Sequence, residues 1–259
     1  MRFVLFPGEK HGLKKHAFWR RKLQEEMAWF DRHLFDRAPS ANEALKPGSL
    51  LDTALKRQRA AQWKGLYGLE HDGHLIPETV RYKGIELGRF EVTRAQYAAF
   101  NPDYPVPAGQ ENYPANRIGF EQAKAYCAWL SERTGARYRL GNQSEMTPIY
   151  QETEAEGNTL DYWAGYKVNP DDATFLQEAT GRLEKEAALL FPVGRFAGTK
   201  GDEPVFDLQG NVAEWVVGED GEGLLLGGSA DTPADDRMSE RSPGPAYTGF
   251  RVVKDQSNV

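Results

Sequence analysis

Apolar residues recur at helical spacing in several stretches of the chain. The strongest is Phe120–Thr134, where aromatic side chains widen an apolar stripe and Gly135 follows as a C-terminal stop. A shorter helix is predicted for Arg94–Phe100, because Thr93 and Gln96 form a capping box at its start. Further helices are predicted near Phe18–Phe35, Leu50–Trp63 and Asp172–Leu189.

Short apolar runs bounded by turn residues predict strands. Arg2–Phe6 is such a run, and Leu66–Leu69 and Leu75–Val80 flank a turn at Asp72-Gly73, as in a hairpin. The other predicted strands are Tyr138–Leu140, Pro204–Leu208, Ala213–Val217, Gly223–Leu226 and Gly249–Val253. The C-terminal part is rich in glycine and proline, so we expect loops around small strands there.

The composition excludes several kinds of site and partner. The chain has 259 residues and a formal net charge of −6, unevenly spread: residues 1–37 carry +4 and the rest −10. An acidic body does not suit a phosphate backbone, so no nucleic-acid partner is expected. No apolar run approaches the about 18 residues of a membrane span. The single cysteine, Cys127, rules out an intrachain disulfide, and all five histidines precede residue 75.

A series of short motifs follows one another from residue 91 onward. They are Glu91-Val92-Thr93 with Tyr97 and Phe100, Ala123 with Tyr126-Cys127 and Trp129-Leu130, Tyr138-Arg139-Leu140, Pro192-Val193, Gly210-Asn211-Val212-Ala213-Glu214-Trp215, Gly227-Gly228-Ser229 and Gly249-Phe250-Arg251. In this order they resemble the formylglycine-generating enzyme (sulfatase-modifying factor) superfamily. The resemblance implies a loop-rich α+β fold of the C-type-lectin-like kind for residues 64–259. Gly141–Met146 departs from the family pattern.

The resemblance also bears on activity. Oxidase members carry two cysteines shortly after Gly-Gly-Ser, whereas Ala230–Glu240 has none, and the iron-dependent relatives use histidines that this region lacks. Because copper(I) needs a soft thiolate, neither copper nor iron is expected. The loop is instead expected to form a ligand-binding face with Asp231, Asp235, Asp236 and Arg237, for an unidentified protein or peptide ligand.

Calcium is the metal that the resemblance leaves open. Asp207, Gly210, Val212 and Glu214 match a family calcium site of two side-chain oxygens and two backbone carbonyls, ligands that calcium prefers. The alternative is a metal-free turn in which Asn211 and Glu214 hydrogen-bond to the backbone.

A second family calcium site is matched only in part. Asp161, Tyr162 and Phe196 occupy three of its positions, but Gly194 stands where the family has an aspartate.

The first residues resemble a different family. Phe3–Gly12, followed by an amphipathic helix with Ala28-Trp29-Phe30-Asp31, is similar to the C-terminal end of prolyl-oligopeptidase-family serine peptidases, where the histidine matched by His11 is the general base. In that fold the serine and aspartate precede the histidine, and only residues 1–10 precede His11. His11 is therefore expected to act only with an upstream peptidase domain. Chance similarity is the alternative.

These observations predict a domain order and a function. Residues 1–37 form a peptidase-like tail, 38–63 a linker and helix, and 64–259 the formylglycine-generating-enzyme-like domain. The favoured function is a non-catalytic binding or accessory module, a bacterial pseudoenzyme at the end of a longer peptidase-like protein. It would be cytoplasmic by default, or periplasmic or secreted if that peptidase is exported. The alternatives are a diversity-generating variable ligand-binding protein and a metal-dependent oxidase with atypical ligands such as Glu240.

Overall fold

The computed structural model describes residues 12, 14–34, 51, 54–55, 63–151, 158–196, 199, 203–232 and 242–255. The chain divides into two units, Met1–Gln62 and Trp63–Val259, which are considered separately. Within the described residues, no helix has the length and apolar character needed to cross a membrane. The predicted strand Arg2–Phe6 and the histidine His11 lie outside the described residues.

The first unit contains the helix α1, His16–His33, where the apolar spacing predicts one. Two i,i+4 ion pairs, Arg21 with Glu25 and Lys22 with Glu26, lie on its polar surface. Most of its large apolar side chains are exposed, namely Trp19, Leu23, Met27, Trp29 and Phe30, and so is Leu34 directly after it. Most of the helix predicted at Leu50–Trp63 lies outside the described residues.

The second unit begins with a two-stranded hairpin, β1 (Leu69–His71) and β2 (His74–Ile76). The predicted turn at Asp72-Gly73 is confirmed, since both residues have positive φ, 45° and 82°, as the tight two-residue hairpin turn requires. This tight turn places Glu70 and His71 in β1, so β1 begins later and ends closer to the turn than predicted.

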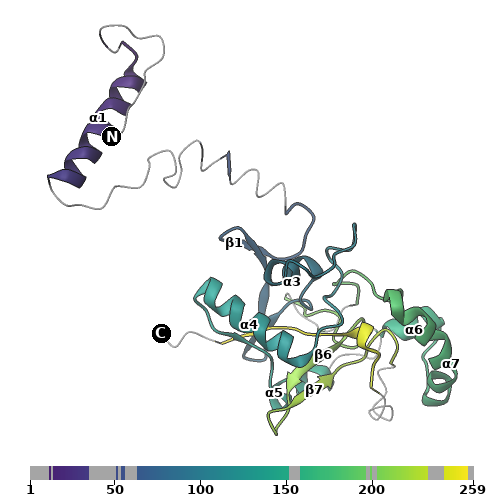
Figure 1. The fold of residues 1–259 in the computed structure, drawn as a ribbon. Coiled ribbons are helices and arrows are strands. Elements are labelled where there is room, and N and C mark those ends of the chain that lie inside the picture. Colours follow the sequence, from purple (N-terminus) through teal and green to yellow (C-terminus); the bar gives the residue numbers. More distant parts are fainter. Residues whose placement is uncertain are drawn as a thin grey trace. The chain divides into compact units, whose positions relative to one another are not determined.

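Two further sheets follow, both made of short strands (Figure 1). The four-stranded sheet has the order β3-β4-β9-β5, from Thr79–Tyr82, Ile85–Gly88, Val253–Lys254 and Tyr138–Arg139. The three-stranded sheet has the order β7-β6-β8, from Gly223–Leu226, Ala213–Val217 and Thr248–Gly249, with β6 and β8 parallel. Pro204–Leu208 does not form a strand, and Gly249–Val253 is divided between β8 and β9.

The helices α3 (Arg94–Phe100) and α4 (Phe120–Thr134) have the predicted bounds. The capping box of α3 is formed, because Thr93 Oγ1 accepts from the backbone of Gln96 and the Gln96 side chain accepts from the backbone of Thr93. Gly135 ends α4 with a φ of 70°. The apolar stripe of α4 packs in the main core with Tyr97 and Phe250.

The remaining helices differ from the prediction. The helix predicted near Asp172–Leu189 is α7, which spans Pro170–Leu183. It begins earlier than predicted because Asn169 Oδ1 accepts from Asp172 N and caps the start. A 3₁₀ turn, η2 (Glu184–Glu186), follows α7, and Ala187 then enters the left-handed region. Two helices were not predicted, namely α5 (Gln143–Gln151) and α6 (Thr159–Ala164). A short 3₁₀ turn, η4 (Pro245–Tyr247), precedes β8.

Candidate functional site

A buried ion pair joins two of the sequence motifs. Glu214 on β6 receives two hydrogen bonds from the Arg251 guanidinium, at 2.7 and 3.0 Å, and Tyr150 donates a third at 2.8 Å. Burial alone would lower the pKa of Arg251, but the Glu214 carboxylate outweighs that effect and raises the pKa. Arg251 also donates to the carbonyls of Gly88 and Phe206, so all these groups are tied to the surrounding backbone.

Two more carboxyl groups lie beside this ion pair. Asp207, at φ 63°, accepts from Phe196 N at 2.8 Å and from Gly194 N, and burial raises the pKa of Asp207 to about 6. Burial, followed by repulsion from Asp207, raises the pKa of Glu91 well above its usual value. Neither carboxyl oxygen of Glu91 has a hydrogen-bond partner among the described residues, so burial beside Asp207 favours the protonated, uncharged form of Glu91.

These contacts bear on whether the predicted donor set suits calcium. Both carboxylates of the proposed set are engaged, Glu214 by Arg251 and Asp207 by backbone N–H groups. A calcium ion would compete with a guanidinium for Glu214, so the donor set does not fit the ion as arranged. Gly210 and Val212 lie in the turn before β6.

The residues after Gly227-Gly228 form a closed hydrogen-bond cluster. Ser229 Oγ donates to Asp231 Oδ1 at 2.7 Å and lies 2.6 Å from Thr232 Oγ1, and Gly244 N donates to Asp231 Oδ2 at 2.9 Å. Asp231, expected on an exposed ligand-binding face, is only 8% exposed and instead holds the backbone near Gly244. The other predicted face residues lie outside the described part: Asp235, Asp236 and Arg237.

The single thiol is also in a closed environment. Cys127 is 2% exposed on the buried side of α4, and burial raises the pKa of its thiol to about 12. A thiol in this state is neither a thiolate ligand nor a nucleophile at neutral pH. Cys127 therefore serves core packing.

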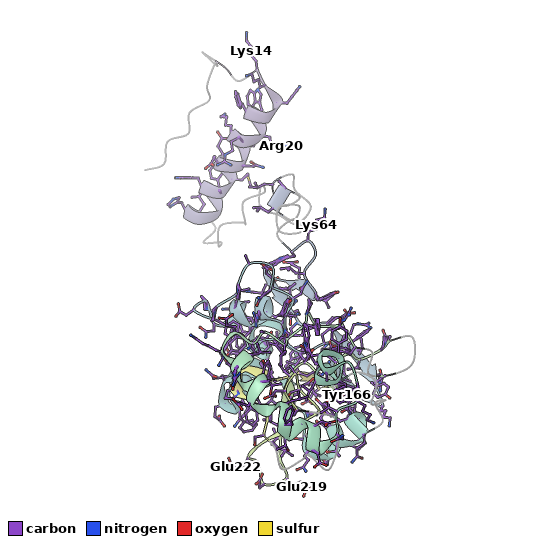
Figure 2. The ribbon with its side chains drawn as sticks, turned by 90° about the vertical axis from the view of Figure 1, so that its right-hand side faces the viewer. Lys14, Arg20, Lys64, Tyr166, Glu219 and Glu222 are labelled. Carbon is purple, nitrogen blue, oxygen red and sulfur yellow. The ribbon has the colours of Figure 1, made fainter. Side chains whose placement is uncertain are left out.

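An exposed group of aromatic rings was not predicted. We call it the aromatic patch, and it comprises Tyr162, Trp163, Tyr166, Phe191, Arg195 and Phe196. Tyr162, Trp163 and Tyr166 are 49%, 48% and 50% exposed, and Figure 2 shows Tyr166 on the face turned toward the viewer. Trp163 stacks on Phe191 with ring centroids 5.0 Å apart, and its indole donates to Leu189 O at 2.8 Å.

Two motif residues hold the patch in place. The side chain of Asn211 accepts from Phe191 N at 3.0 Å and donates to Phe191 O at 3.2 Å, as the metal-free alternative expects of Asn211. Asp207 binds the backbone N–H groups on either side of Arg195. The segment that presents Phe191, Arg195 and Phe196 is therefore anchored in the buried cluster.

A cation lies on the aromatic faces. The Arg195 guanidinium carbon is 5.3 Å from the ring centre of Tyr162 and 5.5 Å from that of Phe191. A cavity of about 480 Å³ opens beside these rings, lined by Asn158, Asp161, Tyr162, Gly165, Tyr166, Lys167 and Phe196. Asp161 Oδ1 accepts from Val168 N at 2.8 Å, and burial raises the pKa of this carboxyl. The clustering of aromatic residues in 162–166 and 191–196 was the available signal in the sequence.

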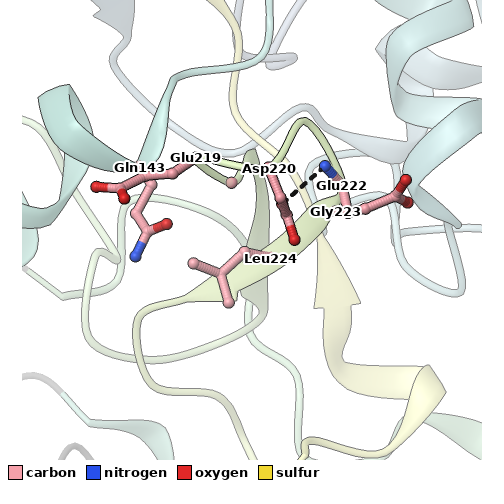
Figure 3. Close-up of a pocket in the computed structure, with 7 residues that line it drawn as sticks. Gln143, Glu219, Asp220, Glu222, Gly223 and Leu224 are labelled. Atoms are coloured by element: carbon pink, nitrogen blue, oxygen red, sulfur yellow. Dashed lines mark hydrogen bonds between the residues drawn. The ribbon is translucent and has the colours of Figure 1, made fainter.

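An acidic hollow lies at the turn between β6 and β7 (Figure 3). It has a volume of about 290 Å³, and its acidic lining residues are Glu219, Asp220 and Glu222. Asp220 accepts from the backbone of Glu222 at 3.0 Å, whereas Glu219 and Glu222 point away from one another. The carboxylates do not converge on one point, which is typical of a solvated turn.

Comparison with known proteins places the second unit in a family context. Residues 64–256 match the Sulfatase-modifying factor enzyme 1-like domain. The structure of PvdO from Pseudomonas aeruginosa is similar, with 21% identity over 66% of this chain and 80% of PvdO, at a TM-score of 0.45. The crystal structure of CarF has 15% identity over 74% of this chain and 97% of CarF, at a TM-score of 0.43. No curated protein sequence matches the chain.

Proposed function

Because the chain belongs to the sulfatase-modifying factor enzyme 1-like family, we propose that its second unit is a non-catalytic binding or accessory module of that family. The fold is the α+β arrangement of the family, and family membership alone does not settle activity. The chemistry of the side chains in the motif region carries the proposal.

The observation that supports it most directly is the closed cluster after Gly228. The oxidase relatives have their two cysteines in this stretch, whereas here the hydroxyls of Ser229 and Thr232 and the carboxylate of Asp231 hydrogen-bond to one another. These are hard oxygen ligands that bind copper(I) poorly, and they are already satisfied. The one thiol of the chain, Cys127, is buried elsewhere in the core.

A binding role is supported by the aromatic patch. Tyr162, Trp163 and Tyr166 leave about half of their surface in contact with solvent. Tyrosine, tryptophan and arginine are the residues that contribute most to protein interfaces. A rigid, exposed group of these residue types suits recognition of a partner.

We also infer that α1 attaches the module to a larger peptidase-like protein. The apolar side chains of α1 that include Leu23, Met27 and Phe30 are exposed in the first unit, as in a helix whose partner surface belongs to another polypeptide segment. Labelling of the chain with a fluorophosphonate probe would show a serine nucleophile in the chain itself and would contradict the expectation that His11 acts only with an upstream peptidase domain.

The test of the main proposal is oxygen uptake. The purified chain is incubated with copper(I) or iron(II) and a cysteine-containing peptide, and dioxygen consumption is followed with an electrode. We expect no consumption above that of the metal and peptide alone. Cys127→Ala is the matched control, because it removes the only thiol of the chain, which could itself oxidise without turnover. Metal-dependent consumption that persists in Cys127→Ala would show an oxidase and end the proposal.

A further inference from the structure

We propose that the aromatic patch binds an acidic peptide segment, in which an aromatic side chain enters the cavity beside Tyr162 while a neighbouring carboxylate pairs with Arg195. This inference rests on the proposed binding role of the module and names its partner class. It is carried by three features of the patch: the order of its rings, the guanidinium of Arg195 and the size of the cavity beside Tyr162.

The rings are held in one arrangement before any ligand arrives. Phe191 is fixed by two hydrogen bonds between its backbone and the Asn211 side chain, which accepts from Phe191 N and donates to Phe191 O, and Trp163 stacks on its ring with an interplanar angle of 10°. Tyr162 meets Phe191 edge to face at 5.0 Å and also contacts Phe196. Exposed rings that are already ordered cost little conformational entropy on binding, which favours a docking site.

Arg195 is the group that selects the charge of the ligand. Its guanidinium lies over two rings and has no hydrogen bond or ion pair with the residues that the structure describes. Stacking leaves the edge of the guanidinium free, and that edge matches a carboxylate with two parallel hydrogen bonds. Lys167, in the cavity lining, adds a second positive charge.

A cationic ligand suits the site less well. Arg195 already covers the aromatic faces of Tyr162 and Phe191 that would attract a cation. The one carboxylate in the lining, Asp161, is engaged by Val168 N. A nucleic acid would combine base stacking with phosphate contacts, but the net charge of −6 opposes its approach. An acidic peptide carries fewer negative charges than a nucleic acid and still supplies an aromatic side chain.

The cavity is large enough to hold one aromatic side chain of such a peptide. Its volume of about 480 Å³ lies in the range of small-ligand sites. Tyr162, Tyr166 and Phe196 supply apolar walls, and Lys167 lies at the same cavity. An aromatic anchor inserted there places the adjacent residues of the peptide near Arg195.

The experiment uses defined probes with the full chain. A fluorescein-labelled hexapeptide of alternating glutamate and phenylalanine is titrated by fluorescence anisotropy. It is compared with a lysine–phenylalanine peptide, a glutamate–alanine peptide and a labelled oligothymidylate. We expect saturable binding of the glutamate–phenylalanine peptide below about 1 mM. The lysine–phenylalanine and glutamate–alanine peptides should bind at least about tenfold more weakly, since each lacks one of the two contacts.

Matched variants assign the binding to the patch. Arg195→Gln and Tyr166→Ala should each weaken binding by about tenfold, and Arg195→Lys should recover only part of the loss because lysine lacks the planar fork. Arg133→Gln removes an exposed arginine in the last turn of α4, a helix that lies apart from α6 in Figure 1, and should have no effect. Phe175→Ala removes a ring that is 85% exposed and should also have none.

Three results would overturn the inference: no binding below about 1 mM, equal binding of the lysine–phenylalanine peptide, or tighter binding of the oligothymidylate. Equal loss in Arg133→Gln and Arg195→Gln would overturn it as well. The outcome is independent of oxygen uptake. If peptides fail while oxygen uptake stays at background, only the assigned partner is wrong. If oxygen is consumed, the non-catalytic role is wrong whatever the peptides do.

Discussion

The exposed aromatic patch lies beside a buried cluster of charged residues, which comprises Glu91, Asp207, Glu214 and Arg251. The two regions differ in whether their charged side chains have partners within the chain. In the cluster, Arg251 and backbone N–H groups satisfy the carboxylates of Glu214 and Asp207. In the patch, the Arg195 cation rests on rings and has no carboxylate partner among the described residues. Interactions completed inside the chain serve the fold, and interactions left open at the surface are available to a ligand.

The two regions are nevertheless connected. Asp207 belongs to the buried cluster, yet its carboxylate accepts from the backbone N–H groups of Gly194 and Phe196 and so shapes the turn that presents Arg195. Asp207, which the resemblance assigned to calcium binding, thus holds the backbone on both sides of Arg195. A substitution in the cluster should affect stability first and the patch second, whereas a substitution in the patch should leave stability almost unchanged.

The largest expected effect comes from breaking the buried ion pair. Arg251→Met leaves the Glu214 carboxylate buried without its cation, and we expect the free energy of unfolding to fall by about 3–5 kcal/mol. Urea denaturation followed by circular dichroism measures this loss. The matched substitution Arg195→Met, at an exposed arginine, should change the free energy of unfolding by less than about 0.5 kcal/mol. Similar losses in the two variants would remove the distinction between the regions.

The next effect is a dependence of stability on pH. Burial raises the pKa of Glu91 well above its usual value and that of Asp207 to about 6. A carboxyl whose pKa is raised by folding stabilises the protein below its unfolded pKa, and this contribution is lost as pH rises through the folded value. The free energy of unfolding should therefore fall by about 1–3 kcal/mol between about pH 5 and pH 8.

Glu91→Gln tests the source of this dependence. The amide has nearly the shape of the protonated carboxyl and, like it, carries no charge, but it does not titrate. We expect a smaller slope of unfolding free energy against pH in the variant, measured by urea denaturation at several pH values. Glu86→Gln is the control, because the pKa of Glu86 is lowered, with the hydrogen bond from Thr79 and the contacts with Lys254 outweighing burial. An unchanged slope in Glu91→Gln would place the titrating groups elsewhere.

A smaller effect is expected where the two regions meet. Asn211 has a φ of 63°, so Asn211→Gly removes both hydrogen bonds to Phe191 without straining the backbone. Because Phe191 N and O lose their partners, we expect a loss of about 1–3 kcal/mol in thermal or urea unfolding. Asn211→Asp keeps the acceptor for Phe191 N but places a fully buried carboxylate against Phe191 O, so it should lose at least as much. Wild-type stability in Asn211→Gly would show that Asn211 does not anchor the patch.

The sequence predicted the elements that depend on local chemistry. The helix Phe120–Thr134 has a continuous apolar stripe and a terminal glycine, and the start of Arg94–Phe100 has its capping box, so their bounds follow from nearby residues. The helix Gln143–Gln151 was missed because Pro148 interrupts its pattern. Its place is set by tertiary packing of Met146 and Ile149 in the core.

The candidate site was predicted less well, for a physical reason. A motif gives residue types, and the partners of Glu214 and Asp207 lie far away in the sequence, at Arg251 and at 194–196. Asp231 lies in a stretch whose composition is typical of a surface loop, but it is buried where it contacts Ser229 and Gly244. The aromatic patch brings together two separate segments, so neither shows periodicity that would reveal a shared surface.

The smallest expected effect concerns the patch itself. Trp163→Phe keeps a ring against Phe191 but removes the indole hydrogen bond to Leu189 O. Since Trp163 is 48% exposed, solvent replaces much of what is lost, and we expect a change of no more than about 1 kcal/mol in unfolding free energy. Its effect should instead appear in affinity for the glutamate–phenylalanine peptide, because the ring is then held less firmly. A large loss of stability with unchanged affinity would show that Trp163 supports the fold and that the patch is an exposed part of the core.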